Sequence, residues 1–507
     1  MTKYIFISII CLSAHYSYGQ TWPKIYGDGF DSNIRGLLET YDGGYIIAGN
    51  ISTNRYMWLI KVDINGNIIW DKKIGNPSNF RSYVDASATT LDHGIILAGG
   101  SKKYDPDGYY DPAFYKFDSC FNLEWCRVLM SPDYNLSTGI IQDNDGTFTG
   151  MMAYYGGDIT TVRISLVKLD ESGEPIWISH LAQEDSLIYN EEGLYFYLSQ
   201  SGNYLVSGRC YYPGSQPFWI LTDNHGDQIW DLKGGHYGQA HQVIEPDSGI
   251  FISTAFFHNG NMPLTPTLFH FEEDGNLLNR YFLFGDTIEM GSASGICHFN
   301  DTSYVIGVCL HDENPVLYDN SELILTDDTG KLIKRKLLIN EYKVPRNIII
   351  TFDSKILVGN TYLVDNNWDI YMWKLNSDLE FDTLYSQPFN YDSLCPYPIV
   401  SDTIDYDCDL FVNIEDLPTK EEYEQSLKVF PNPASEYVVF DLKEKETNRN
   451  CVIQIFNAIG TKQEGRRVTP GSLHVTINIQ NYPPGPYIAV LRNDERIIAK
   501  GKFVVGR

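Results

Sequence analysis

The sequence lacks long apolar runs and the residue patterns of common enzymes and metal sites. After its first nineteen residues it has no stretch of about 20 apolar residues, so we expect no transmembrane segment. It contains no Cys-x-x-Cys and no Cys/His cluster at zinc spacing, which argues against a zinc site. Gly-x-Ser-x-Gly, His-Glu-x-x-His and phosphate-cradling glycine loops are also missing. We therefore assign no catalytic, cofactor-binding or metal-binding residue.

Positive charge is scarce. The chain has 38 Lys and Arg against 65 Asp and Glu, a formal net charge of −27. Only the tail is basic, with twelve Lys and Arg against seven Asp and Glu from Lys428 onward. Because an acidic surface repels phosphate, we expect no nucleic-acid partner.

The first nineteen residues have the features of a secretory signal peptide. Lys3 supplies the positive start, Tyr4 to Ala14 form a short apolar stretch, and small residues precede a cleavage site between Gly19 and Gln20. The apolar stretch is too short to span a bilayer. We expect residues 1–19 to be removed on export.

Eight cysteines remain once Cys11 leaves with the signal peptide, which suits an oxidising compartment. Their spacing suggests three local disulfides, the last closing a loop worth about 3 kcal/mol. The expected pairs are Cys120 with Cys126, Cys297 with Cys309, and Cys395 with Cys408.

A repeat of about fifty residues runs through positions 20–389. Each unit has a buried-type run such as GGYIIAGN, then an alternating run, an Asp-x-x-Gly turn and a strand that often ends in Trp, as in WLIKVDINGNIIW. The first-position acid or amide of the turn recurs seven times, at Asp63, Asp118, Asp170, Asp223, Glu272, Asp327 and Asn376.

Seven units of three or four strands each predict an all-β chain with a seven-bladed β-propeller. Residues Thr21 to Gly27 (TWPKIYG) match the end of a unit, IIWDKKIG. We therefore expect this first strand to pair with the last blade and close the ring. The repeats resemble those of exported Bacteroidetes-type propeller proteins and of quinoprotein-type propellers. Their turn is one residue shorter than in the quinoproteins, so the resemblance implies the fold and no quinone cofactor.

After the repeats, residues 390–427 form an acidic stretch that we interpret as a linker holding Cys395 and Cys408. Residues 428–507 then contain short strands separated by Pro, Asn and Gly turns. That pattern predicts a small Ig-like β-sandwich.

The tail resembles the type A sorting domain of the type IX secretion system. The matching residues are Phe430, Pro431, Asn432 and Pro433, the turn at Gly460, then Gly485 and Tyr487, and the basic Lys500 and Lys502 near the end. The resemblance implies the type IX secretion machinery as a partner, passage across the outer membrane, and a secreted or cell-surface location.

Other candidate sites rest on weaker patterns. The stretch Asp105 to Pro112 and the Asp-x-x-Gly turns could ligate calcium, although none has a complete twelve-residue calcium loop. His236 and His241 could face a central channel. The triplets at Asp286 and Asp402 resemble Bacteroidetes-type O-glycosylation sites.

Three functions stay open at this point. The first is a displayed propeller that binds glycans or surface proteins without catalysis. The second is an enzyme acting on extracellular polysaccharide, with acidic residues on one propeller face. The third is a structural role at the cell surface. An exposed Tyr/Trp platform would favour the first, and a carboxylate pair in a central cleft the second.

Overall fold

The structure is a computed structural model of the chain. Gly19 and Gln20, the predicted cleavage site, and the triplet at Asp286 lie outside the described residues. The structure describes residues 21–27, 29–51, 56–75, 81–102, 110–130, 136–155, 162–181, 195–210, 215–257, 264–285, 289–311, 320–341, 343–364, 367–405, 408, 410–413, 417–419, 423, 426–443, 445, 447, 451–458, 460–493 and 497–506.

The chain divides into two compact units, which are described separately below. The second unit runs from Leu417 to the C-terminus and includes Ile176–Ile178. None of the described residues belongs to a helix long and apolar enough to cross a membrane.

The first unit consists of four-stranded antiparallel sheets in sequence order. The first three sheets are β2 (Ser32–Glu39), β3 (Tyr45–Ile51), β4 (Tyr56–Val62) and β5 (Ile68–Ile74); β6 (Arg81–Thr89), β7 (Ile95–Lys102), β8 (Asp111–Phe117) and β9 (Leu123–Met130); and β10 (Leu136–Gln142), β11 (Phe148–Tyr155), β12 (Val162–Leu169) and β13 (Pro175–Leu181). The next three are β14 (Tyr195–Leu198), β15 (Tyr204–Cys210), β16 (Gln216–Thr222) and β17 (Gln228–Lys233); β18 (Gly238–Asp247), β19 (Ile250–Phe257), β20 (Thr265–Glu272) and β21 (Leu277–Phe282); and β22 (Met290–Asn300), β23 (Ser303–His311), β24 (Asn320–Asp327) and β25 (Leu332–Ile339).

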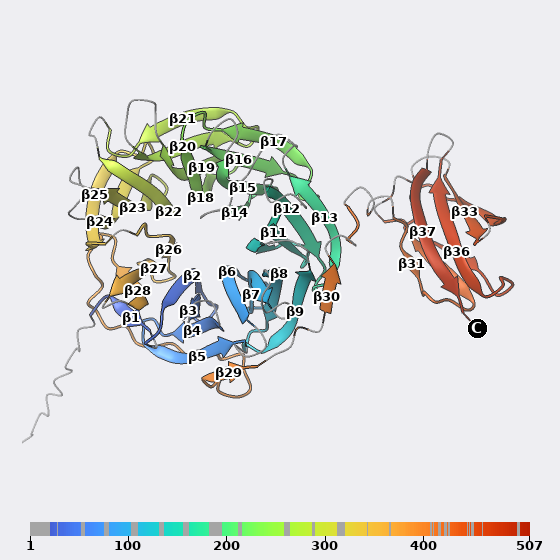
Figure 1. Ribbon diagram of the computed structural model, residues 1–507, viewed down its shortest axis with the longest axis horizontal. Helices are drawn as coiled ribbons and strands as arrows, with labels where there is room; N and C mark the ends of the chain where they lie inside the picture. Colours follow the sequence, from blue (N-terminus) through green and yellow to red (C-terminus); the bar gives the residue numbers. More distant parts are fainter. Residues whose placement is uncertain are drawn as a thin grey trace, which may run out of the picture. The chain divides into compact units, whose positions relative to one another are not determined.

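A further sheet joins the two ends of the repeat region. It contains β26 (Asn347–Ile350), β27 (Ile356–Val364), β28 (Asn367–Leu375) and β1 (Lys24–Tyr26), with Ile25 opposite Tyr371. The prediction that the N-terminal strand pairs with the last repeat is confirmed. The seven sheets follow one another around a ring, with the first strand of each nearest the centre and the last at the rim, like propeller blades (Figure 1).

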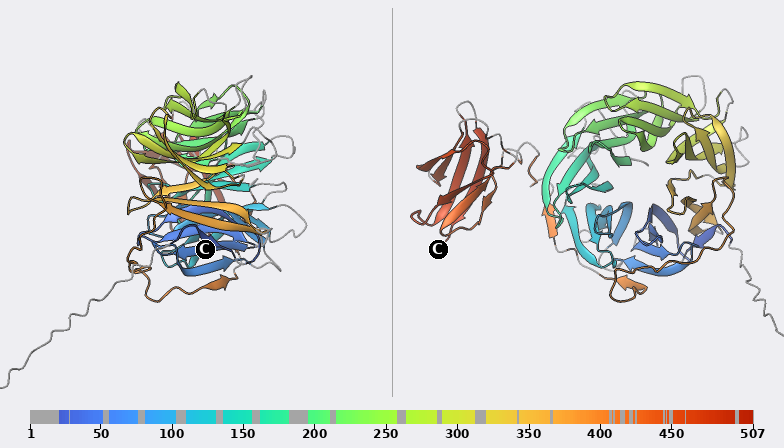
Figure 2. Two further views of the ribbon diagram at one scale, coloured as in Figure 1. Left: turned by 90° about the vertical axis from the view of Figure 1, so that its left-hand side faces the viewer. Right: turned by 180° about the vertical axis from the view of Figure 1, so that it is seen from behind.

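The core lies between neighbouring sheets. The two central strands of each sheet are buried on both faces, which explains their near-continuous apolar runs, as in YIIAGNI of β3. Between the first and second sheets, Trp70 packs on Phe121 with ring centroids 4.6 Å apart. Successive sheets therefore share a core, which holds the ring together. Figure 2 shows the same ring of sheets from the side and from behind.

Residues 390–427 were expected to form a linker, but the described residues of its first part, 390–405, 408 and 410–413, are bound to the rim of the first unit. β29 (Asp402–Ile404) adds in parallel to β5, and β30 (Leu410–Asn413) adds in parallel to β9. We call residues 384–413 the strap. Two outer edge strands are covered in this way, and both disulfides of the described residues attach the strap.

The second unit contains two sheets that enclose their own core. One sheet is β31 (Val429–Phe430), β32 (Tyr437–Asp441) and β35 (His474–Asn478). The other is β34 (Lys462–Val468), β33 (Cys451–Asn457), β36 (Gly485–Arg492) and β37 (Ile497–Val505), in that order. Apolar and exposed residues alternate along β36, as expected when one face of a sheet meets water.

Candidate functional site

A lysine is buried beneath the turns of the first sheet. Lys61, fully buried, donates from Nζ to Asp42 at 2.8 Å and to Thr40 at 2.6 Å. Burial lowers the pKa of the Lys61 ammonium. Burial alone would raise the pKa of Asp42, but the Lys61 charge and hydrogen bond lower it below its usual value. The pair joins the β2–β3 turn to β4, next to the β4–β5 turn.

A lysine at the same position forms an ion pair with an Asp of the turn before the second strand in three other sheets, each at 2.7 Å. In the remaining sheets the lysine position holds Leu221, His270 or Leu325. The sequence analysis missed these pairs, although a Lys two residues before the turn acid or amide, together with the Thr-x-Asp before the second strand in three of the four sheets, could have indicated them. In the third sheet Asp143 stands at the Thr position instead. The recurring pairs are Lys116 with Asp92, Lys168 with Asp143, and Lys374 with Asp353.

The Asp-x-x-Gly turns use their carboxylates on their own backbone. Asp63 accepts the backbone N–H groups of Asn65 and Asn67, both at 2.8 Å, and Gly66 has a φ of +77°. This geometry explains the Asp and Gly of the motif without a ligand. No group of three or more potential metal ligands occurs among the residues that the structure describes. Most of the Asp105–Pro112 stretch lies outside them, and calcium stays an untested prediction.

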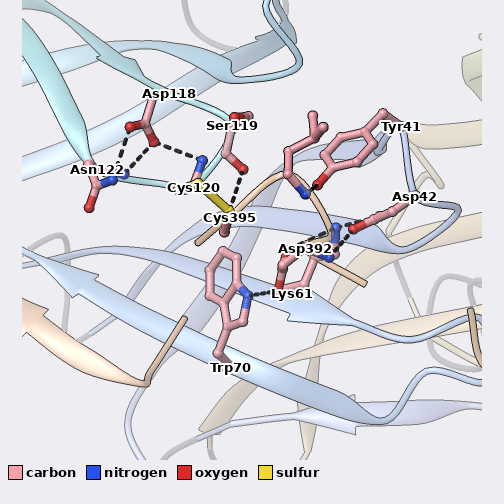
Figure 3. The surroundings of a disulfide bond; sticks show 11 residues. Tyr41, Asp42, Lys61, Trp70, Asp118, Ser119, Cys120, Asn122, Asp392 and Cys395 are labelled. Atoms are coloured by element: carbon pink, nitrogen blue, oxygen red, sulfur yellow. Dashed lines mark hydrogen bonds and ion pairs between the residues drawn. A yellow bond between two sulfur atoms is a disulfide. The ribbon is translucent and has the colours of Figure 1, made fainter. Parts of the chain in front are cut away.

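The strap passes over these turns in the first sheet. Trp70 donates its indole N–H to Asp392 at 2.9 Å, and the Asp392 backbone N–H donates to Asp42 at 2.8 Å. Cys395 is then joined to Cys120 in the β8–β9 turn (Figure 3). The strap is therefore fixed to two neighbouring sheets by polar contacts and a covalent bond.

Several large apolar side chains of the strap stay exposed. Tyr397 is 80% exposed, although the strap is bound to the ring on both sides of it, through Asp392 and through β29. Apolar side chains that stay in water do not stabilise the fold. Their exposure on a fixed segment is typical of a surface that contacts another molecule. The exposed set on this segment is Leu384, Tyr385, Phe389, Leu394, Tyr397 and Val400.

The predicted local disulfides are wrong, although four of the six cysteines do form disulfides. Cys120 bonds Cys395, and Cys126 bonds Cys408, across 275 and 282 residues. Cys120 lies in a turn, whereas Cys126 lies on β9, about 10 Å along the extended strand from its first residue. A disulfide needs Cα atoms about 4.4–6.8 Å apart, so the strand itself prevents the local bond.

Strand register likewise separates the second predicted pair. Cys297 of β22 lies opposite Val305, and Cys309 of β23 lies opposite Ser292. The two cysteines are therefore four residues out of register, about 13 Å along the ladder. Neither forms a disulfide with a residue that the structure describes.

The two candidate channel histidines have different surroundings. His236 is exposed, with its ring near Phe257. His241 lies in a bulge of β18, an innermost strand, and is buried against Tyr195 and Phe256. Burial, followed by nearby arginine charge, lowers the pKa of His241 to about 3, so its imidazole is neutral at pH 7.

In the second unit, the Pro-Asn-Pro motif is tied to the last strand. Asn432 accepts the backbone N–H of Val504 at 2.8 Å and donates from its amide to the carbonyl of Lys502 at 3.4 Å. The Ala434 N–H also donates to the Val504 carbonyl at 2.9 Å. The motif therefore closes the sandwich by holding β37 in place.

The turn and aromatic residues of the motif also build the sandwich. Gly460 has a φ of +79° in the β33–β34 turn, which favours glycine. Gly485 begins β36, and Tyr487 donates its hydroxyl to the Pro483 carbonyl at 2.8 Å while stacking on Phe503. These residues shape the unit from within.

Three motif residues instead reach the surface. Lys500 and Lys502 lie two apart on β37, so they share one face, and both are exposed. Phe430 is also exposed, on β31. None of the three belongs to the core of this unit.

Residues 428–506 match the family described as the secretion system C-terminal sorting domain. The second unit is a sorting domain. Its presence indicates that the protein is secreted or displayed at the cell surface. The position of the sorting domain at the end of the chain agrees with the tail residues identified from the sequence.

Solved structures give distant likenesses to the chain. Extracellular domains 1–2 of Drosophila semaphorin 1a match at 10% identity and a TM-score of 0.40, covering 69% of this chain and 87% of that one. The β-propeller domain of the Trilobed protease from Pyrococcus furiosus matches at 10% identity and 0.36, covering 77% and 97%. A protein of unknown function from Bacteroides caccae matches at 9% identity and 0.33, covering 50% and 82%. A comparison with curated protein sequences finds no match.

Proposed function

We propose that this protein is an exported seven-bladed β-propeller, followed by an Ig-like sorting domain, that binds surface glycans or proteins without catalysis. The seven sheets of the ring and the closing strand β1 support the blade count. An N-terminal signal peptide would carry the chain to the periplasm, and the sorting domain would direct it through the type IX machinery.

One observation carries the binding proposal: the exposed apolar side chains of the strap on a covalently fixed support. A loose segment would lose conformational entropy on binding, whereas a segment already held by two disulfides and two added strands loses less. Tyrosine and phenylalanine rings also stack on sugar faces and pack in protein interfaces. Tyr385, Phe389 and Tyr397 supply such rings here.

The test measures retention of the mature protein on a panel of immobilised polysaccharides, with released sugar assayed in the same tubes. Retention without release, reduced about tenfold by Tyr385→Ala/Tyr397→Ala, would support the proposal. A matched control, Tyr237→Ala, changes an exposed tyrosine in the connection between β17 and β18 and should keep full retention. Release of sugar would replace the proposal with a polysaccharide-acting enzyme.

A further inference from the structure

A groove of about 580 Å³ lies between the fifth and sixth sheets. It runs from the end of β21 to the β24–β25 turn. Such a volume is in the range of sites that hold a ligand or a few residues of a peptide. Its lining residues are Arg280, Tyr281, Phe282, Leu283, Phe284, Gly285, Glu289, Thr329, Gly330, Lys331 and Leu332.

The tryptophan that recurs at the junctions of the first sheets is missing at this junction. Trp125 packs its ring against Gly173 in the turn of the next sheet, and Trp230 packs in the same way against Gly275. The equivalent of these tryptophans is Asn279, which lies opposite His270, just as Trp70 lies opposite Lys61. In place of an indole, Tyr281, Leu268 and Leu283 lie closest to Gly330 in the next turn.

The same junction between the first and second sheets is occupied by the strap. By repeat position, groove residues 280–284 correspond to 71–75, and residues 329–332 correspond to 120–123. Asp402–Ile404 pairs with Lys72–Ile74 of β5, and Cys395 bonds Cys120. In this protein, a junction of this kind therefore binds an extended polypeptide segment, which adds as a parallel strand.

The strap presents acidic side chains to its junction. Asp392 accepts the Trp70 indole N–H at 2.9 Å, and Asp402 forms an ion pair with Lys72 at 2.8 Å. Side chains of β29 and the preceding residues also reach the core, since Ile399 and Ile404 pack against it. The occupant therefore combines carboxylates with aliphatic groups.

The open groove offers complementary charge. Arg280 stacks on Phe257, 4.5 Å from its ring centroid, and neither Arg280 nor Lys331 forms an ion pair with a carboxylate of the described residues. The one acid of the lining, Glu289, is paired with Arg335 at 3.2 Å. In a protein of net charge −27, these two available cations make the groove locally attractive to acidic groups.

We propose that this groove binds an extended acidic segment of a partner protein, which adds as a parallel strand to β21. Within the described residues, no strand pairs with the outer edge of β21, and Leu277 and Leu278 are exposed there. Carboxylates of the segment meet Arg280 and Lys331, and its aliphatic side chains pack on the apolar residues of the lining, as Ile399 and Ile404 of the strap pack on the core. The inference is independent of the strap surface, so failure of polysaccharide retention leaves it standing.

The experiment uses the full-length mature protein with its disulfides intact, and a fluorescein-labelled peptide copied from the strap, Tyr397–Asp405 (YPIVSDTID). We expect saturable binding by fluorescence polarisation. A peptide with Asp402→Lys and Asp405→Lys should bind about tenfold more weakly, because both carboxylates that face the cations are reversed.

Two protein variants locate the binding. Arg280→Glu/Lys331→Glu should weaken binding about tenfold. Lys233→Glu, a matched charge reversal at the exposed end of β17, should change nothing. Peptide binding that survives Arg280→Glu/Lys331→Glu with the fold intact, or no saturable binding, would overturn the proposal. Binding of polygalacturonate alone, lost in Arg280→Glu/Lys331→Glu, would assign the groove to acidic polysaccharide and overturn it too.

Discussion

At the scale of residues, the buried Lys61–Asp42 pair of the first sheet is replaced by uncharged residues in another sheet of the same chain. In the fourth sheet Leu221 and Ser201 occupy the two positions, so one unit of the same fold manages without the charges. Removing one partner of a buried pair leaves an uncompensated charge and costs about 3–5 kcal/mol, whereas replacing both with a compatible pair costs far less.

We therefore expect Asp42→Ser to lower the free energy of unfolding by about 3–5 kcal/mol, and Lys61→Leu/Asp42→Ser to recover most of that loss. Urea unfolding followed by tryptophan fluorescence reports on the ring alone, because all nine tryptophans precede residue 374. A double variant as unstable as the sum of both single changes would contradict this account.

His270 gives the ring a dependence on pH. Burial lowers the pKa of its imidazole to about 4, and Nε2 has no hydrogen-bond partner among the described residues. Because the unfolded chain has a histidine pKa of about 6.5, the unfolded state binds the proton more tightly. The stability from neutral His270 is complete above pH 6.5 and is lost as the pH falls toward 4.

Leucine occupies this position in two other sheets. The His270→Leu variant should therefore lose about 3 kcal/mol less free energy of unfolding between pH 7 and pH 4 than the unchanged protein. The measurement is urea unfolding of both proteins from pH 7 to pH 4. Equal loss of stability in both would show that other groups cause the acid effect.

At the scale of elements, the strap depends on its disulfides because it contributes only two short strands to the rim. Removing Cys126–Cys408 by Cys126→Ser/Cys408→Ser should cost about 2–4 kcal/mol. It should also expose the amides of β29 and β30, which hydrogen exchange detects. Protection of β29 and β30 unchanged in this variant would mean that strand pairing alone holds the strap.

At the scale of the whole molecule, local repetition made the ring predictable. Alternating apolar runs and Asp-x-x-Gly turns recur every 49 to 55 residues, and TWPKIYG copies the end of a unit, so the closing strand β1 followed from the sequence. The sorting motif was also readable, since its residues recur in a fixed order and Gly460 belongs to a short local turn, although the contact of Asn432 with Val504 was not predictable.

The strap and the groove could not be read in the same way. The strap has no repeat, and its disulfides join residues about 280 positions apart, so spacing favoured the wrong local partners. The groove has no sequence motif either, because its lining comes from two neighbouring units, residues 280–285 with 289 and residues 329–332. The fading of Trp was visible in the sequence, but the lining of the groove followed only from the packing of neighbouring sheets.

The most direct test of the central claim, that the sorting domain exports this ring, is the location of the protein after changing that domain. Deleting residues 428–507 should leave the ring folded and trapped in the periplasm. Lys500→Glu/Lys502→Glu should act in the same direction, because both side chains are exposed on one face of β37. Lys462→Glu, an exposed lysine on β34, is the matched control and should keep normal export. The account predicts intact protein in the medium or at the cell surface only when the sorting domain is present; unchanged export of the truncated chain would contradict it.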